Sequence, residues 1–379
     1  MKFAFLLTPA TRLALGLVVL GLLASCSSAP VKPKPVALAP DAALLGVRLA
    51  WTSKVGAVNF PLDVKVVGNN VFVASSDGLV VALDARTGAE QWRTSVGGQI
   101  AAGVGSDGHF AAVITRSNEL VTLDGGHEIG RQTLPAQSFT APLVAGGRIF
   151  VLAADRSVTA FDAPSGRKLW NQQRPGESLV LRQAGVLLAV GDTLVAGLSG
   201  RLVGINPLTG AIRWEAPIAS PRGTNDIERL VDLVGPASRV GDIVCARAFQ
   251  ASVGCVDAAQ GTLLWTKPAL GSVGVQGDES HVFGTESDGK VMAWRRADGE
   301  RAWVSELLRY RSLTAPLVVG RSVVVGDEAG LVHWLSRADG TALTRASTDG
   351  SALVAAPVLA AGTLVAVTHS GGIFGFKPE

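Results

Sequence analysis

The sequence predicts an all-β fold, an eight-bladed β-propeller with four-stranded antiparallel blades. A motif made of a strand, a polar residue, a turn ending in glycine and a tryptophan recurs about every 40 residues. Short apolar runs bounded by turn residues separate the copies, which corresponds to about four strands per repeat. One tryptophan strand precedes the first repeat and the last repeat lacks one, as the closure of a ring requires.

Residues 1–25 have the features of a bacterial lipoprotein signal peptide. Basic residues precede an apolar run from Leu13 to Leu23, a length typical of a secretory signal and short of the roughly 20 residues that a membrane span needs. The run leads into Ala24-Ser25-Cys26, the pattern of a lipobox, which predicts that the Cys26 thiol carries diacylglycerol. The alternative is an ordinary secretory signal that happens to contain a cysteine.

Residues 26–44 are expected to form a lipidated, proline-rich tether. Four prolines between positions 30 and 40 favour an extended chain. Acyl chains bind a bilayer with about 0.8 kcal/mol per buried CH₂, so the anchor needs no spanning segment. Ser27 stands where an aspartate would resemble the inner-membrane retention signal. The expected location is therefore the periplasmic face of the outer membrane.

Residues 45–379 are expected to form the propeller. In each repeat an Asp or Asn side chain can bond its own backbone two residues on, and the glycine provides a positive φ, so the turn closes a hairpin. The tryptophan that follows can cover the gap between adjacent sheets. A β-sandwich, the alternative all-β architecture, does not require a tryptophan at a fixed period. The recurring tryptophans are Trp92, Trp170, Trp214, Trp265 and Trp303.

The count of eight units includes two worn copies, meaning repeats in which the turn is recognisable but the tryptophan is missing. The interval from Trp92 to Trp170 covers two periods, with a worn copy at Leu123–Gly126 between them, and a second worn copy reaches its tryptophan position at Thr344. Trp51 lies one period before the first complete copy, and the last repeat ends at the C-terminus without a tryptophan strand. We therefore expect the N-terminal strand to complete the last blade.

The motif also carries a family resemblance. The copy Ala82–Trp92 resembles the repeat of quinoprotein alcohol dehydrogenases. With the lipobox and the length, the whole chain resembles the BamB family, the propeller lipoproteins of the outer-membrane β-barrel assembly machinery. The resemblance implies a non-catalytic scaffold without a cofactor, which binds the POTRA domains of the barrel-inserting subunit BamA and other assembly subunits. Unfolded outer membrane proteins are a further partner class, through pairing with sheet edges.

Two segments, Gly176–Arg182 and Asn225–Leu233, depart from the blade rhythm. In the BamB family a Leu-x-Leu-Arg segment and an Ile-Asp-Arg-Leu-x-Asp-x-Asp segment contact the POTRA domains. One position departs from that pattern, since Val234 stands where the family has its second aspartate and a salt bridge there is absent. The resemblance implies four partner-binding residues: Leu179, Leu181, Arg182 and Asp232.

These residues also have structural alternatives. Leu179 and Leu181 alternate as they would in a buried strand, and Arg182 and Asp232 could form an ion pair between two loops, which contributes little when exposed. The binding interpretation is favoured because arginine is a frequent interface anchor and because loops on rigid scaffolds carry function. The two segments are expected to build a surface patch and no cavity.

The sequence gives no support for catalysis. No two cysteines are adjacent, as in the vicinal disulfide of many quinoproteins, and the five histidines have no metal-ligand spacing. No nucleophile-elbow, Walker or zincin motif occurs. With 34 basic and 31 acidic residues spread along the chain, nucleic acid is not an expected partner. The alternative function is a quinone-dependent or ligand-binding periplasmic propeller, which would have polar residues converging on its funnel.

Cys245 and Cys255 remain once Cys26 is assigned to lipid. They flank a predicted hairpin with its turn near Phe249–Ser252, so the two thiols can meet across the strands in an oxidising compartment. A cross-strand disulfide is therefore one hypothesis, and two small buried hydrophobic residues are the other.

Overall fold

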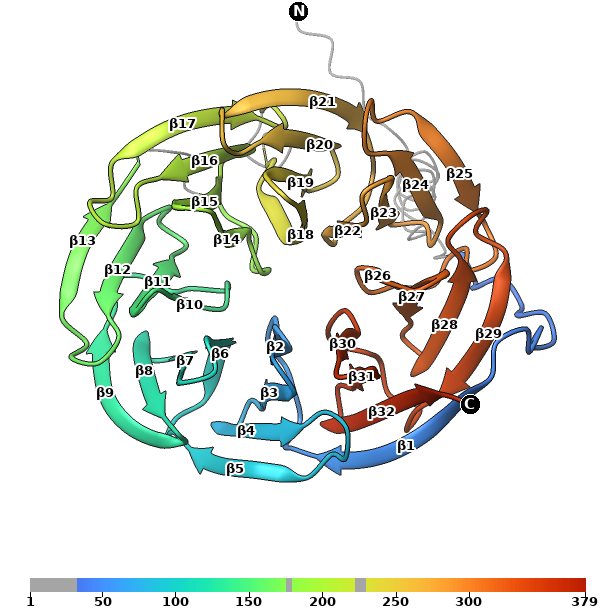
Figure 1. Ribbon diagram of the computed structural model, residues 1–379, viewed down its shortest axis with the longest axis horizontal. Helices are drawn as coiled ribbons and strands as arrows, with labels where there is room; N and C mark the ends of the chain where they lie inside the picture. The colour runs from blue at the N-terminus through green and yellow to red at the C-terminus, as the bar shows by residue number, and fades with distance from the viewer. Residues whose placement is uncertain (1–32, 175–178, 222–229) are drawn as a thin grey trace, which may run out of the picture. The chain divides into compact units, whose positions relative to one another are not determined.

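Eight four-stranded antiparallel sheets surround a central channel, one after another along the chain (Figure 1). The computed structural model describes residues 33–174, 179–221 and 230–379. Its strands within Val36–Glu379 form one compact unit. Among the described residues, no helix has the length and apolar character of a membrane span. The predicted eight-bladed propeller is confirmed.

Each blade consists of four successive strands, with the first lining the channel and the fourth on the outside (Figure 1). Blades one to four are β2(Lys65–Val67), β3(Asn70–Ala74), β4(Leu79–Asp84) and β5(Glu90–Ser95); β6(Ile100–Ser106), β7(Phe110–Thr115), β8(Glu119–Asp124) and β9(His127–Thr133); β10(Leu143–Ala145), β11(Arg148–Leu152), β12(Val158–Asp162) and β13(Lys168–Gln172); β14(Leu187–Val190), β15(Thr193–Leu198), β16(Arg201–Ile205) and β17(Ile212–Pro217).

Blades five to seven follow the same order, and blade eight takes its fourth strand from the N-terminal part of the chain. These blades are β18(Leu233–Val240), β19(Ile243–Ala248), β20(Ser252–Asp257) and β21(Thr262–Pro268); β22(Val275–Gly277), β23(His281–Thr285), β24(Val291–Arg295) and β25(Arg301–Ser305); β26(Leu317–Val319), β27(Ser322–Gly326), β28(Leu331–Ser336) and β29(Ala342–Ser347); β30(Val358–Ala360), β31(Thr363–Val367), β32(Gly372–Pro378) and β1(Val47–Lys54).

The propeller has two faces that differ in the connections they carry. The connector face holds the links from the fourth strand of one blade to the first strand of the next, and the turn face holds the turns between third and fourth strands. These turns form as the sequence predicts. In the first of them, Asp84 Oδ1 accepts hydrogen bonds from the backbone amides of Arg86 and Thr87 at 2.9 and 3.1 Å, and Gly88 has a φ of 73°.

The recurring tryptophans join neighbouring blades. The indole Nε1 of Trp265 in blade five donates to the carbonyl of Arg296 in blade six at 2.7 Å, and Trp51 donates to Ala85 of blade one at 2.9 Å. The turn glycine of the next blade leaves room for each ring, since a Cβ on Gly88 would lie 2.6 Å from Trp51. Apolar residues of adjacent sheets fill the rest of each junction. The motif therefore encodes blade-to-blade packing.

The ring is closed by pairing of the two ends of the propeller. β1 pairs with β32 in antiparallel register, from Val47 opposite Pro378 to Lys54 opposite Gly372. The pairing removes an edge from each terminal strand. The predicted closure is confirmed.

The chain before β1 is also bound to the propeller. The segment Val36–Leu45, which we call the strap, lies along the outside of blade seven. Arg345 of β29 donates to the carbonyl of Ala39 at 2.8 Å, and Leu38 packs on the apolar core between blades six and seven. The sequence predicted a tether at residues 26–44 and a propeller from residue 45. Residues 36–44 of that predicted tether therefore contact the folded domain as part of the strap.

Candidate functional site

The predicted partner-binding residues lie in two neighbouring links of the connector face. Leu179, Leu181 and Arg182 belong to the link from β13 to β14, and Asp232 ends the link from β17 to β18. Residues 179–181 form no strand, and the Leu179 side chain is 39% exposed. The alternative of a buried strand is therefore wrong.

Asp232 fixes the backbone of the first link. Its Oδ2 accepts a hydrogen bond from the amide of Leu181 at 3.0 Å, and its Oδ1 lies 3.6 Å from Arg156 Nη2. The same Arg156 nitrogen donates to the carbonyl of Leu179 at 3.2 Å. Side-chain exposures of 9% for Arg156 and 19% for Asp232 keep this ion pair largely away from water. The pair acts as a brace that holds Leu179 outward.

Arg182 takes no part in this brace. Its side chain is exposed, and its guanidinium lies 5.4 Å from the centre of the Phe139 ring, a cation–π arrangement. Asp232 pairs with Arg156 instead, so an ion pair between Arg182 and Asp232 is not formed among the described residues. The structure thus divides the predicted set into an outward group of Leu179 and Arg182 and an inward Asp232.

Arg156 and Phe139 are the residues that sequence reasoning missed. Arg156 occupies a turn between β11 and β12 with a φ of 62°, and Phe139 precedes β10. Both come from blade three and are distant in sequence from Asp232. A turn arginine between polar neighbours gives no sequence signal of its buried partner, so only the fold identifies it.

Val234 is buried, with 2% of its surface exposed, and its backbone bridges to Gly185. An acidic side chain here would lose its hydration, so valine suits this position. The sequence predicted no cavity here, and the two links together with blade three line a small open hollow of about 60 Å³. Its walls include Phe139, Arg156, Leu181, Asp232 and Val234.

Some predicted residues lie outside the described part of the chain. They are Cys26 with the signal peptide, Gly176–Ser178 of the first link and Asn225–Arg229 of the second.

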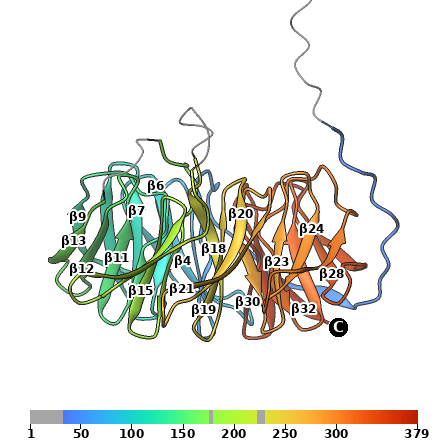
Figure 2. The ribbon, with the colours of Figure 1, turned by 90° about the horizontal axis from the view of Figure 1, so that it is seen from above.

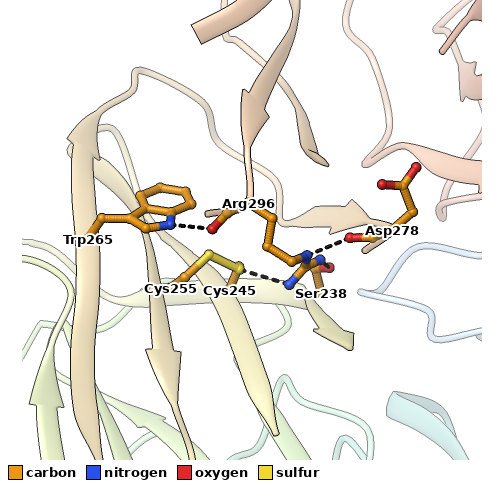
Figure 3. The surroundings of a disulfide bond; sticks show 6 residues. All are labelled: Ser238, Cys245, Cys255, Trp265, Asp278 and Arg296. Atoms are coloured by element: carbon orange, nitrogen blue, oxygen red, sulfur yellow. Dashed lines mark hydrogen bonds between the residues drawn. A yellow bond between two sulfur atoms is a disulfide. The ribbon is translucent and has the colours of Figure 1, made fainter. Parts of the chain in front are cut away.

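Cys245 and Cys255 face each other on β19 and β20, with their Cα atoms 4.0 Å apart and their sulfur atoms joined in a disulfide (Figure 3). Arg296 of blade six reaches this bond: its Nη1 lies 3.2 Å from Cys245 Sγ, and its other nitrogens donate to Ser238 Oγ and to the carbonyl of Asp278. Burial lowers the pKa of Arg296 below its ordinary value. The disulfide therefore lies at the junction of blades five and six.

The central channel encloses about 840 Å³ and is the place where a funnel ligand would bind. Its walls are mostly small and apolar, and the carboxylates that line it are those of Asp63 and Glu328. Loss of hydration raises the pKa of the Asp63 carboxyl, and the positive charge of Lys65 opposes this change. The described residues contain no group of three His, Cys, Asp or Glu side chains that could hold a metal ion. In the described part of the chain the channel lining is therefore mostly apolar, which differs from the convergent polar lining expected of the alternative function.

The comparisons with known proteins agree with this geometry. The family described as "Outer membrane protein assembly factor BamB" matches residues 76–305, more than half of the chain. The chain belongs to the BamB family. A BamB of Burkholderia pseudomallei is 38% identical over 361 residues, which cover 94% of this chain and 95% of the relative. A BamB of Bordetella pertussis is 34% identical, with 94% of each chain covered.

Solved structures agree on the fold. The crystal structure of BamB from Moraxella catarrhalis has a TM-score of 0.80 at 24% identity, covering 87% of this chain and 99% of that one. A quinohemoprotein alcohol dehydrogenase from Comamonas testosteroni has a TM-score of 0.67 at 15% identity, covering 88% and 77%. At these identities the likeness concerns the propeller alone, which BamB shares with an enzyme family.

Proposed function

We propose that this protein is a non-catalytic scaffold of the machinery that assembles β-barrel proteins in the outer membrane. It binds the POTRA domains of the barrel-inserting subunit BamA through Leu179, Leu181, Arg182 and Asp232. The relatives' shared name, outer membrane protein assembly factor, supports the general role. The observation that carries the site is the buried Arg156–Asp232 brace beneath an exposed leucine.

The brace makes the surface suitable for a protein partner. Binding costs less entropy when a loop is already held in its bound shape. Two hydrogen bonds, one with Asp232 and one with Arg156, hold the backbone of residues 179–181, and the ion pair holds these two side chains together. The exposed ends of this surface are an apolar side chain, Leu179, and a cationic one, Arg182. Arginine is among the residues enriched in interface hot spots, and Leu179 adds an apolar contact beside Arg182.

We further propose that the scaffold is anchored by lipid on Cys26 at the periplasmic face of the outer membrane. In this proposal residues 1–25 are removed, residues 26–44 link the anchor to the propeller, and residues 45–379 form the scaffold. Two or more acyl chains give stable binding without a spanning segment. Lipid on the mature N-terminus would appear as a mass increase on Cys26 in the membrane-extracted protein.

The test of the site is capture of purified BamA POTRA domains by variants of the outward residues. Leu179→Ala and Arg182→Ala should each weaken binding by about 30-fold or more, because truncating an interface hot spot costs roughly 2 kcal/mol or more. Two control variants lie on the connector face away from the site: Leu270→Ala, at a leucine that is 63% exposed, and Arg116→Ala, at an exposed arginine. Both should bind as wild type.

Asp232→Asn separates bracing from direct contact. If Asp232 acts through the brace, this variant should lower the affinity for the POTRA domains. It should also speed hydrogen exchange at the amide of Leu181, which donates a hydrogen bond to the Asp232 carboxylate. The proposal fails if wild-type protein does not capture the POTRA domains, or if the outward variants bind as well as their controls. Circular dichroism of each variant verifies that the propeller is intact.

A further inference from the structure

The direction of β1 determines where the chain would leave the propeller. β1 is the fourth strand of blade eight, and its first residue, Val47, pairs with Pro378 at the C-terminal end of β32. Fourth strands begin at the turn face, as β29 does where Ala342 pairs with Leu335. A chain leaving directly from Val47 would therefore emerge on the turn face, opposite the candidate partner site.

The strap carries the chain to the other face. At the turn face Arg321, in the turn between β26 and β27, donates to the carbonyl of Leu44 at 2.9 Å. At the connector face the amide of Val36 donates to the carbonyl of Arg309 at 3.0 Å, in the link that follows β25. Figure 2 shows this segment in blue, rising beside the propeller from the side of the C-terminus to the opposite side.

Side chains along the strap strengthen its attachment. Arg345 holds its middle at Ala39, and Thr344 Oγ1 lies 3.3 Å from Asp41 Oδ2. Leu38 fills a place on the apolar core between blades six and seven. Arg345 occupies the same repeat position as Arg93 of blade one, which instead donates to the carbonyl of Lys54 in blade eight. Blade seven thus uses a blade-joining arginine to bind the strap.

We infer that the strap sets the orientation of the propeller at the membrane, with the connector face towards the bilayer. This inference rests on the proposed lipid anchor at Cys26. From Cys26 to Val36 the chain can span at most about 35 Å, whereas from Cys26 to Val47 it could span about 70 Å. The strap therefore halves the reach of the anchor and moves its origin to the face that carries Leu179 and Arg182.

The height of the propeller makes this orientation selective. A fourth strand of five to eight residues spans about 17–26 Å. To bring the turn face to the bilayer, the free tether would have to run back along this height and use most of its length. The connector face therefore lies nearer the membrane, and a partner bound there would sit between the propeller and the bilayer.

The experiment measures energy transfer from single labels on the lipidated protein to headgroup-labelled lipid in phospholipid vesicles. Leu270→Cys places a label on the connector face and Gln260→Cys on the turn face. Both flank β21, are exposed and do not touch the strap. The native disulfide is fully buried and does not compete for the label. Transfer should be higher from position 270 than from position 260.

A variant with a broken strap, Leu38→Ser with Arg345→Ala, should reduce or reverse this difference. Arg93→Ala, at the same repeat position in blade one, is the matched control and should preserve it. Hydrogen exchange measured on the same samples should show slow exchange at the amides of Val36 and Leu44. This protection should be lost only when the strap is broken.

The outcomes separate the orientation from the anchor. Equal or reversed transfer in floating wild-type vesicles would overturn the orientation while leaving the lipid anchor intact. Protein that fails to float with the vesicles would remove the anchor itself, and the orientation with it. Fast exchange at Val36 and Leu44 in wild type would overturn the strap regardless of the membrane.

Discussion

The junction between blades five and six contains a buried ion pair whose loss should destabilise the whole ring. Arg247 of β19 is completely buried, and its Nη1 lies 2.9 Å from Oε1 of Glu286 in blade six, which is 8% exposed. Burial lowers the pKa of Arg247 and Glu286 opposes the change. Glu286→Gln removes the negative charge but retains an oxygen that can accept the hydrogen bond from the amide of Leu270.

The size of the effect follows from the burial. Removing one partner of a buried ion pair costs about 3–5 kcal/mol, because the remaining charge lacks both water and a counter-ion. An unfolding entropy of about 2.1 cal/mol/K per residue gives about 0.7 kcal/mol/K for a propeller of roughly 340 residues, so Tm should fall by about 4–7 °C. Thermal unfolding followed by circular dichroism measures this shift.

Two comparisons test the reasoning. Glu300→Gln removes the charge partner of Lys267, an exposed pair across the same junction, and should change Tm by no more than about 1 °C. Replacing both Arg247 and Glu286 by methionine should recover most of the loss, since no unpaired charge remains. If Glu286→Gln unfolds within 1 °C of wild type, or the double variant is no more stable than the single one, the buried charge does not dominate this junction.

Three further predictions concern turns, the disulfide and pH. Gly88→Ala should cost about 1–3 kcal/mol more than Gly68→Ala in urea unfolding, because both glycines have positive φ but only the first would press a Cβ against a tryptophan. Thiol titration of denatured, unreduced mature protein should find no free thiol from Cys245 or Cys255. Burial raises the pKa of Asp349, but hydrogen bonds from nearby hydroxyls outweigh it and lower the pKa to about 2. The resulting stability is present above about pH 4 and lost as pH falls towards 2, so Asp349→Asn should show a smaller decline of Tm over that range.

The ring was predictable because its information is local. A turn glycine and a tryptophan four residues later reveal the outer strands of five blades, and the position of Trp51 before the first repeat reveals the closing strand. Even the worn copy in blade two could be counted by its spacing, although Gln132 fills the space beside Gly166 that a tryptophan ring occupies elsewhere. Repeats need only nearest-neighbour packing, so the period alone is sufficient.

The details of the site were not predictable because they depend on contacts between blades. The sequence suggested Arg182 as the ion-pair partner of Asp232, but the fold brings Arg156 of blade three against Asp232 instead. The same limit applies to the chain before β1. Prolines predicted an extended tether, and its binding to the propeller depends on Arg321 and Arg345, more than 270 residues later in sequence.

The pairing of β1 with β32 also determines when the protein can fold. Val47 and its partner Pro378 are more than 300 residues apart, so the closing contact forms only after both ends of the propeller have been synthesised and brought together. Until then β1 and the first blades present unpaired edges, the surfaces through which partly made β-proteins aggregate. A scaffold proposed to help other β-proteins close would therefore depend, until its own ring closes, on protection of the same kind of edge.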